Sequence, residues 1–226
     1  MYDAIRVMNE DYSKRNADTA AIVPSFQGIA ANCQIEFRLA NIDPQGNCTN
    51  GIDRVVSALT NNADDNAKLN PWPYQNYLNI WVINTFSSAH SGAAAYAYYP
   101  GAAFPANKDG IISLYSYVGS IGASNPFNAR TLTHEAGHCL NLAHVWGSTN
   151  QPGVACGDDG VTDTPETMGW TSCNLTGSIC NPPIIENVQN YMEYSFCDVM
   201  FTEGQKTRMH AALNSSVGSR SNLWTP

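Results

Sequence analysis

Hydrophobic positions recur along the chain with two different spacings, and these predict where helices and strands form. In residues 2–16, Ile5, Met8 and Tyr12 stand at helical spacing, so we expect a helix with one buried face. Residues 33–40 instead alternate between apolar and polar side chains, which is typical of a half-buried strand. The first part of the chain therefore predicts both helix and strand.

The middle of the chain continues this mixture. Residues 77–86 and 110–119 are rich in β-branched and aromatic side chains, which favours buried strands. Residues 91–101 are small and aromatic and end in Pro-Gly, which fits an edge strand or an extended loop. Residues 129–140 predict a helix, with Asn128 as its N-cap.

Regular patterning is weak in residues 156–197, which are rich in Gly, Pro, Asn, Ser and Thr. A last helix is predicted after Phe201, where Thr202 and Gln205 match the T-x-x-Q capping box. The order of elements is strands and helices, then a long irregular region, then one helix. This order indicates an α/β (α+β) fold without internal repeats.

Composition and charge narrow the function classes. The 226 residues are 43% hydrophobic and 13% charged, which suits one large packed domain or two small ones. Because the net charge is -8 and no run of Lys or Arg occurs, we do not expect nucleic acid as a partner. No apolar run approaches the roughly 20 residues that span a bilayer, so we expect no membrane association.

Residues 1–18 lack the apolar core of a signal peptide, which leaves an intracellular protein or a processed fragment. Four of the seven cysteines fall within the irregular residues 156–197, which bury little apolar surface and would gain from cross-links. Four cysteines allow three pairings, and a set of free buried thiols is the alternative. Cys33 and Cys48 flank a turn-forming segment and are a further candidate pair. Disulfides favour an oxidising, extracytoplasmic setting.

Residues 131–147, TLTHEAGHCLNLAHVWG, hold the clearest chemical signal. On a helix, His134 and His138 share one face and can present two imidazoles to one metal ion. Glu135 lies one position round, near a metal-bound water but off the ligand axis. A catalytic zinc takes three protein ligands, so His144 becomes the third if the chain turns back after the helix. The alternative is a chance pattern on a solvated helix.

Asn141 stands where that turn must occur. Helices commonly end on a residue with left-handed backbone geometry, which glycine adopts without strain and asparagine tolerates next best. Asparagine costs about 1 kcal/mol relative to glycine there, which is small beside the binding free energy of a three-histidine zinc site. The sequence therefore predicts a positive φ at Asn141 and a His144 that still reaches the metal.

The pattern H-E-x-x-H-x-x-N-x-x-H resembles the metzincin zinc motif, which has glycine at the position of Asn141. Met192 in QNYMEYS is similar to the methionine of the metzincin turn. Further segments make the chain resemble the pappalysin (cytophagalysin) family in particular: HVW, DGVTDTP, MFTEGQKTRM, IEFRLANIDPQGNCTNGIDRV and LNIWVIN. Besides Asn141, the chain departs from the family in a short segment between Tyr194 and Cys197.

The resemblance implies a single metallopeptidase catalytic domain, residues 1–226. Its upper subdomain, about 1–144, would hold a twisted five-stranded mixed sheet with backing and active-site helices. A lowest, antiparallel edge strand near 92–97 would bind the substrate main chain by strand addition, through Ala94, Ala95 and Tyr96. The lower subdomain, about 145–226, would be irregular, bridged by disulfides and closed by a helix.

The family likeness also implies cross-links, partners and a second cofactor. Family bridges suggest the pairs Cys156–Cys180 and Cys173–Cys197. The protein would be a secreted monomer that acts on proteins or peptides, made with an inhibitory prosegment absent from this chain. Calcium would be the second metal, since a Gly-containing loop offers hard oxygen ligands: Asp158, Asp159, Asp163 and Glu166. A solvated acidic loop is the alternative.

The implied reaction is hydrolysis of peptide bonds by zinc-activated water, with Glu135 as general base and then general acid. Tyr194 resembles a family tyrosine that swings between zinc and the transition state, and packing under the cleft is its alternative role. Met192 would form a hydrophobic base beneath the metal. Asp198 would favour Arg or Lys after the scissile bond, whereas the neighbouring Phe196 favours an apolar pocket.

Two other functions fit parts of the pattern. In a catalytically inactive zinc- and calcium-bound extracellular module, Asn141 would be a mark of decay. Decay commonly removes the general base, however, and Glu135 is present. A different zinc hydrolase, such as an amidase, fits less well, because the methionine turn and the predicted edge strand favour peptides. The sequence therefore predicts a secreted zinc metalloendopeptidase.

Overall fold

The computed structural model describes residues 1–224, and the chain divides into two compact units that interleave along the sequence. The first unit consists of three segments, Met1–Met8, Phe37–Leu140 and Ala212–Pro226. The second consists of Asn9–Glu36 and Asn141–Ala211. The sequence predicted one boundary near residue 144, whereas the chain passes between the units repeatedly.

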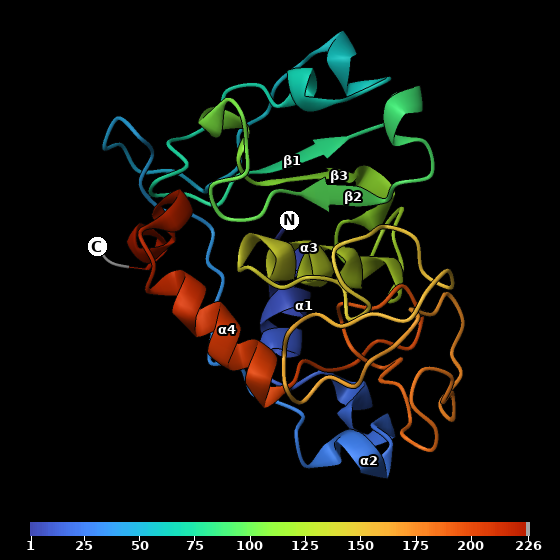
Figure 1. Ribbon diagram of the computed structural model, residues 1–226. Coiled ribbons are helices and arrows are strands. Elements are labelled where there is room, and N and C mark those ends of the chain that lie inside the picture. The colour runs from blue at the N-terminus through green and yellow to red at the C-terminus, as the bar shows by residue number, and fades with distance from the viewer. Residues whose placement is uncertain (225–226) are drawn as a thin grey trace. The chain divides into compact units, whose positions relative to one another are not determined.

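A mixed three-stranded sheet with the order β1-β3-β2 forms the frame of the first unit. β1 (Ile80–Ile83) runs parallel to β3 (Ile111–Leu114), and β2 (Ala95–Ala97) pairs antiparallel with β3. In Figure 1 these strands lie beside α3 (Thr131–Cys139), which contacts both β2 and β3. The predicted α+β class, its mixed sheet and its antiparallel edge strand are thereby confirmed.

The sheet is smaller than expected, with three strands in the described residues instead of five. Residues 33–40 form no ladder there, and Gln34 within them has left-handed backbone geometry (φ 56°) instead of the extended geometry of a strand. The strand expected at 110–119 ends at Leu114, where a 3-10 turn over Tyr115–Tyr117 begins. The sequence patterns thus located the three strands of the sheet but overestimated the number and length of strands.

A buried lysine lies against the sheet of the first unit. Lys68 is fully buried, its Nζ donates to the Lys108 carbonyl at 2.8 Å, and it pairs with Asp65 at 2.9 Å. The rings of Trp81 and Tyr96 pack on the ammonium group, and the Tyr96 hydroxyl donates to Asp65 at 2.8 Å. These contacts fix the side chain of Tyr96, which packs from β2 against the core.

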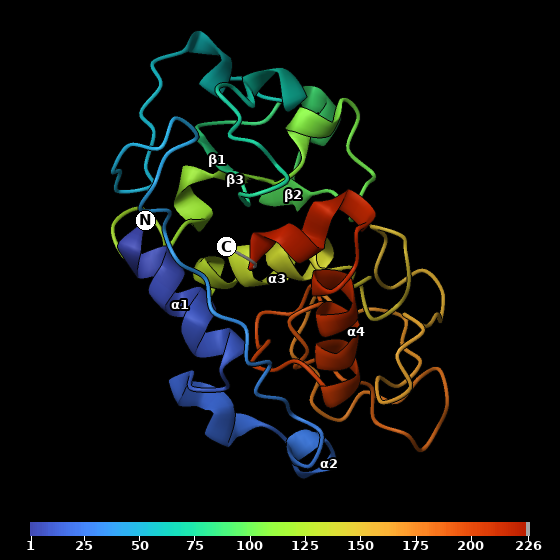
Figure 2. The same ribbon diagram turned by 90° about the vertical axis from the view of Figure 1, so that its left-hand side faces the viewer.

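The second unit is mostly irregular, as its composition predicted. Figure 2 shows it as loops around α4 (Glu203–Leu213), with the short α2 (Pro24–Gln27) at its edge. Two disulfides bridge the loops, Cys156–Cys180 and Cys173–Cys197, which confirms both pairings that the family likeness suggested. Linking residues 24 apart limits the unfolded chain and stabilises the fold by roughly 3 kcal/mol for each bridge.

The capping box of α4 is confirmed. The Thr202 backbone N–H donates to Gln205 Oε1 at 3.0 Å, and the Gln205 N–H donates to Thr202 Oγ1 at 3.1 Å. α1 (Tyr2–Tyr12) is shorter than the predicted 2–16, because Lys14 adopts a left-handed conformation (φ 54°). Local sequence therefore set where α4 begins more accurately than where α1 ends.

Two local predictions are wrong. Asn128 does not cap the active-site helix, because its side chain donates to the Ser116 carbonyl while Asn125 Oδ1 accepts from the N–H of residues 127 and 128. Cys33 and Cys48 form no disulfide. Cys33 is buried and its N–H donates to the Tyr12 carbonyl, whereas Cys48 is an exposed thiol within a separate turn.

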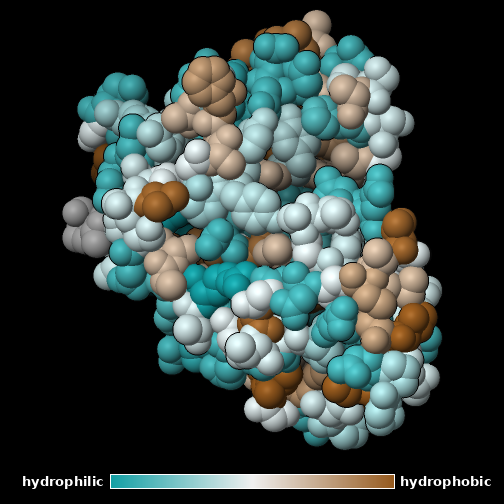
Figure 3. Space-filling view, in the orientation of Figure 1, coloured by the Kyte–Doolittle hydropathy of each residue, from teal (hydrophilic) through white to brown (hydrophobic). Residues whose placement is uncertain are grey.

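The surface shows no sign of a membrane segment among residues 1–224, since none of their helices has the length and hydropathy that crossing requires. On the face drawn in Figure 3, hydrophobic side chains are interspersed with hydrophilic ones. Scattered exposed apolar side chains are normal on protein surfaces and do not by themselves mark a docking area.

Candidate metal centre

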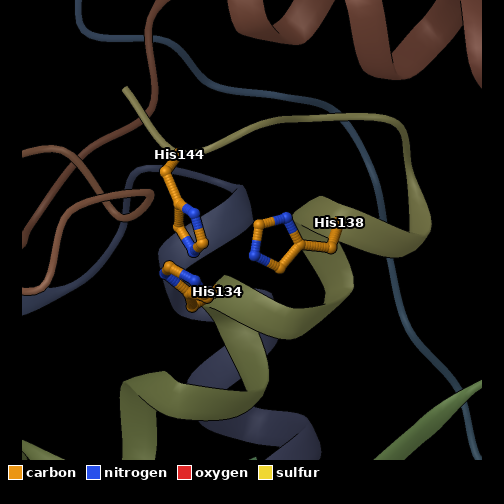
Figure 4. Close-up of side chains that lie close together, drawn as sticks. All are labelled: His134, His138 and His144. Atoms are coloured by element: carbon orange, nitrogen blue, oxygen red, sulfur yellow. The ribbon is translucent and has the colours of Figure 1, made fainter. Parts of the chain in front are cut away.

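Three buried histidines converge on one point. His134 and His138 lie on one face of α3 with ring centroids 4.7 Å apart, and His144 joins them from the segment that follows the helix. One ring nitrogen of each lies within 4.8 Å of the others (Figure 4). Within residues 1–224 no other group of three or more His, Cys, Asp or Glu side chains meets that criterion. The ligand set predicted from the sequence is therefore assembled.

The turn that makes this convergence possible occurs at Asn141. α3 ends as the Leu140 N–H donates to the carbonyls of Ala136 and Gly137, both at 3.0 Å. Asn141 then adopts a φ of 72°, as predicted. Because a straight helix would carry His144 about 9 Å beyond His138, this left-handed residue is what returns the chain to the two helix histidines.

His144 is held by neighbours that fix its tautomer. Its Nδ1 lies 2.9 Å from the Thr149 carbonyl oxygen. A carbonyl only accepts, so Nδ1 carries the hydrogen and Nε2 is left with a lone pair for a metal ion. The ring stacks on Trp146 with centroids 4.5 Å apart, and Trp146 Nε1 donates to the same carbonyl at 3.0 Å. Thr149 could not be predicted from the sequence, because a backbone carbonyl has no side-chain signature.

Glu135 is buried beside its two histidine neighbours on α3. Its Oε2 is buried without a hydrogen-bond partner, and burial raises the pKa of its carboxyl group to about 8. A buried carboxylate without a partner is costly, whereas a nearby divalent cation would favour its ionised form. Three imidazole nitrogens beside this group suit zinc, which accepts nitrogen donors and keeps a position open for water in catalytic sites.

Met192 and Tyr194 lie in the segment that packs behind His144. Met192 is fully buried, and its carbonyl accepts a hydrogen bond from the Val145 N–H at 3.4 Å. Its own N–H donates to Asn190 Oδ1 at 2.9 Å. The ring of Tyr194 stands edge-on to the His144 ring at 4.9 Å and is 41% exposed. Tyr194 therefore neighbours the third histidine, whereas Met192 contacts the residue that follows it. The roles of both stay predictions.

Asn190, which sequence reasoning missed, fixes this methionine turn. Asn190 and Gln205 exchange two side-chain hydrogen bonds at 2.9 and 3.0 Å. The capping-box glutamine therefore both caps α4 and holds the residue that binds the Met192 N–H. The signal was present as an asparagine two residues before Met192, but its partner lies 15 residues further along the chain.

The edge strand β2 leads toward the metal ligands. The Ala94 carbonyl accepts from the Leu114 N–H at 2.9 Å, and Tyr96 lies opposite Ile112 on β3. In an antiparallel ladder alternate residues bond inward, so the backbone groups of Ala95 and Ala97 point to the open edge. Just beyond the strand, Tyr99 packs edge-on against the His138 ring at 5.4 Å.

The four candidate calcium ligands do not form one cluster. Asp163 accepts from the Thr202 hydroxyl at 2.7 Å and the Gly204 N–H at 2.9 Å, so it caps α4 instead. Asp158 and Glu166 are exposed. Asp159 is buried, its Oδ2 has no hydrogen-bond partner, and burial raises the pKa of its carboxyl group to about 6. Among the four, Asp159 alone keeps a buried oxygen without a hydrogen-bond partner, and the calcium site stays a prediction.

The specificity candidates lie after the methionine turn. Asp198 is half-buried, while Phe196 is 57% exposed. Their positions leave both alternatives for the pocket open.

Three converging imidazoles, with a buried carboxyl group next to the first of them on α3, fit a zinc hydrolase centre of the peptidase type rather than a closed structural zinc site. A family model described as "Pregnancy-associated plasma protein-A", that of the M43 peptidases, matches residues 61–214. The chain belongs to this family, and the resemblance to pappalysins is confirmed.

Curated relatives agree with this membership. The chain is 36% identical over 145 residues to an extracellular metalloprotease of Colletotrichum graminicola, a match that covers 61% of this chain and 49% of the relative. It is also 36% identical over 140 residues to extracellular metalloprotease 1 of Coccidioides posadasii, covering 58% and 48%. The chain thus spans about half the length of the curated relatives it matches.

Solved structures show the same fold. Mature mirolysin of Tannerella forsythia, in complex with a cleaved peptide, matches with a TM-score of 0.88 at 33% identity, over 99% of this chain and 87% of that one. A promirolysin mutant from the same organism matches with a TM-score of 0.85 at 33% identity, over 98% and 76%. The metallopeptidase fold is therefore shared over nearly the whole chain.

The left-handed turn predicts opposite results for two substitutions at one position. Asn141→Gly should bind zinc as tightly as the parent chain, because glycine adopts a φ of 72° without strain. Asn141→Ala should lose about 1 kcal/mol or more of unfolding free energy and bind zinc more weakly. Urea denaturation and zinc competition with a chelator measure both effects. Equal zinc affinity and stability in the two variants would contradict the role given to Asn141.

Proposed function

We propose that this protein is a secreted zinc-dependent endopeptidase in which residues 1–226 form one catalytic domain. The observation that carries the proposal is the convergence of His134, His138 and His144, next to Glu135, whose buried Oε2 has no hydrogen-bond partner. Membership of a peptidase family supports it. Relatives named extracellular metalloproteases and two disulfides support the extracellular setting. A monomer made with an inhibitory prosegment stays a prediction.

The chemistry assigns a task to each residue. A zinc ion held by the three histidines would polarise a peptide carbonyl and lower the pKa of a water molecule towards ~7. Glu135 Oε2, which has no other partner, accepts the proton of the attacking water and returns it to the leaving amine. Tyr194 donates its hydroxyl to the negative charge that develops on the substrate oxygen. Met192 is the buried apolar support behind His144.

The substrate main chain binds along β2. The open-edge backbone groups of Ala95 and Ala97 bond to it, Ala94 and Tyr96 hold the strand to β3, and Tyr96 is further fixed by Asp65 and the buried Lys68. Of the two pocket alternatives, we propose that Asp198 selects Arg or Lys after the scissile bond, because a half-buried carboxylate pairs with a cation.

Calcium is proposed at Asp159 alone among the four acidic candidates. Its Oδ2 is buried without a partner, while Oδ1 already accepts from the Val161 N–H at 2.9 Å and from the Thr164 hydroxyl. A calcium ion would take Oδ2 together with backbone oxygens of the surrounding loop, which is the oxygen-rich ligand set that it prefers.

Substitution of the general base separates chemistry from metal binding. Glu135→Ala should keep zinc bound and lose peptide cleavage by at least about a thousandfold, because proton transfer is removed while the ligands stay. Tyr194→Phe should lose about a hundredfold. Zinc content by mass spectrometry and cleavage of a fluorogenic peptide measure the two properties. Full activity in Glu135→Ala would end this mechanism, and full activity in Tyr194→Phe would return that residue to a packing role.

Cleavage of a peptide library tests the specificity proposal. We expect Arg or Lys after the scissile bond, and we expect Asp198→Asn to remove that preference while leaving zinc binding unchanged. A preference for Leu or Phe would rule out Asp198 as the selector.

The best library peptide also tests strand addition. Methylating its backbone nitrogens one at a time should raise KM at those that face β2, because each methyl group removes one donor to the strand edge. The nitrogens that face away serve as the control. A KM that does not depend on the methylated position would exclude pairing with β2.

Calcium removal tests the Asp159 proposal. Chelating calcium while zinc is retained should lower the melting temperature of the parent chain, and Asp159→Asn should abolish this difference. Glu166→Gln, at an exposed acid of the same loop, is the matched control and should keep it. Because burial raises the pKa of Asp159 to about 6, protons compete with calcium below that pH and the gain should shrink there. An unchanged melting temperature would count against the site.

A further inference from the structure

The carboxyl end of α3 is held by an arginine from far along the chain. Arg220 is 2% exposed, and its Nε donates to the carbonyl oxygen of Cys139 at 2.7 Å. Cys139 is the last residue of α3 and directly follows the ligand His138. Carbonyls in the last turn of a helix have no partner within the helix. The guanidinium satisfies one of them and places a positive charge at the negative end of the helix dipole.

Asp109 fixes the orientation of the same guanidinium. Arg220 Nη1 and Nη2 donate to its two carboxylate oxygens at 2.7 and 3.0 Å, and the pair is buried, with side chains 2% and 4% exposed. Asp109 stands two residues before β3, which begins at Ile111. The planar guanidinium group is hydrogen-bonded to Cys139 through Nε and to Asp109 through both Nη atoms. These bonds fix its orientation relative to α3 and β3.

The segment that carries Arg220 also lies tightly against the loop after β2. Gly218 has a φ of 58°, and a Cβ atom there would lie 2.6 Å from the Gly101 nitrogen and 3.1 Å from Pro100 Cα. This loop includes Tyr99, whose ring packs edge-on against His138 at 5.4 Å. Only glycine permits this approach, so the segment is seated against the surroundings of a metal ligand.

We propose that Arg220 is a positioning residue for the metal centre. By holding the Cys139 carbonyl against β3, it fixes where α3 ends and therefore where the left-handed turn at Asn141 begins. That turn sets the path on which His144 returns to the other two histidines. The inference rests on the proposed zinc site.

Stability alone is a weak account of this contact. A buried ion pair repays its desolvation only with good geometry, and replacing such pairs by apolar residues is often neutral or stabilising. In this pair the arginine also donates through Nε to the last carbonyl of α3. The contact therefore orients the end of the helix that carries two metal ligands. Groups that orient metal ligands from behind typically change metal affinity 10–100-fold when they are removed.

Zinc affinity measured apart from stability tests the proposal. For the parent chain, R220Q and R220K, we would measure the zinc dissociation constant by competition with a chromophoric chelator, and the unfolding free energy of each zinc-free protein in urea. R220Q should bind zinc about tenfold more weakly or worse. R220K keeps a cation that reaches the carbonyl but not the fork to Asp109, so its loss should be smaller.

The matched control is I83A, which removes a buried side chain from β1, the strand separated from β2 by β3. It should lower the unfolding free energy, because it leaves a cavity in the core, and leave zinc affinity within about twofold of the parent chain. The proposal is overturned if R220Q binds zinc within twofold of the parent chain, or if I83A weakens zinc binding as much as R220Q does.

If R220Q does not fold, R220K decides by the same criterion. A parent chain that binds no zinc would reject the proposed function together with this inference. A parent chain that binds zinc and cleaves peptides, with R220Q unchanged in affinity, would reject the inference alone.

Discussion

The left-handed turn at Asn141 is the constraint on which the rest of the metal centre depends. Helical geometry alone supplies His134 and His138 on one face, but a helix that continued would carry the third histidine away. A φ of 72° at Asn141 reverses the chain, and the Thr149 carbonyl then fixes the His144 tautomer. The Met192 turn packs behind this returning segment through the Val145 N–H. The strain of one non-glycine residue in this conformation, about 1 kcal/mol, is small beside the free energy of zinc binding by the assembled ligands.

Because the polar groups of the centre are buried, a bound cation would stabilise them. Three imidazoles and the Glu135 carboxyl group lie out of solvent, and Glu135 Oε2 finds no partner in the described chain. An unsatisfied buried group costs roughly 1–3 kcal/mol, whereas zinc binding in small zinc domains contributes about 10–16 kcal/mol. The metal term is therefore several times larger than the cost of the site. Folding and metal binding should be coupled, and the polar site is tolerated because a cation completes it.

Much of the site could be predicted because its signals are local. Helix spacing, the tolerance of asparagine for a positive φ and the capping box all act within a few residues, and all three appear in the structure. The family likeness added both disulfides. Distant partners were not predictable: Asp163 accepts hydrogen bonds at the start of α4, and Cys33 is buried away from Cys48, with which it forms no disulfide. Arg220 contacts Cys139, which lies 81 positions before it in the sequence, and Asp109, which lies 111 positions before it. No spacing pattern reveals contacts over such separations.

The central claim is that one zinc ion is held by three imidazoles on a chain that turns back at Asn141. X-ray absorption at the zinc edge of the purified protein tests it most directly. The account predicts three imidazole nitrogens at about 2.0–2.1 Å, together with one further oxygen donor from water. A zinc ion with two imidazoles, or with a sulfur ligand from the neighbouring Cys139, would contradict it.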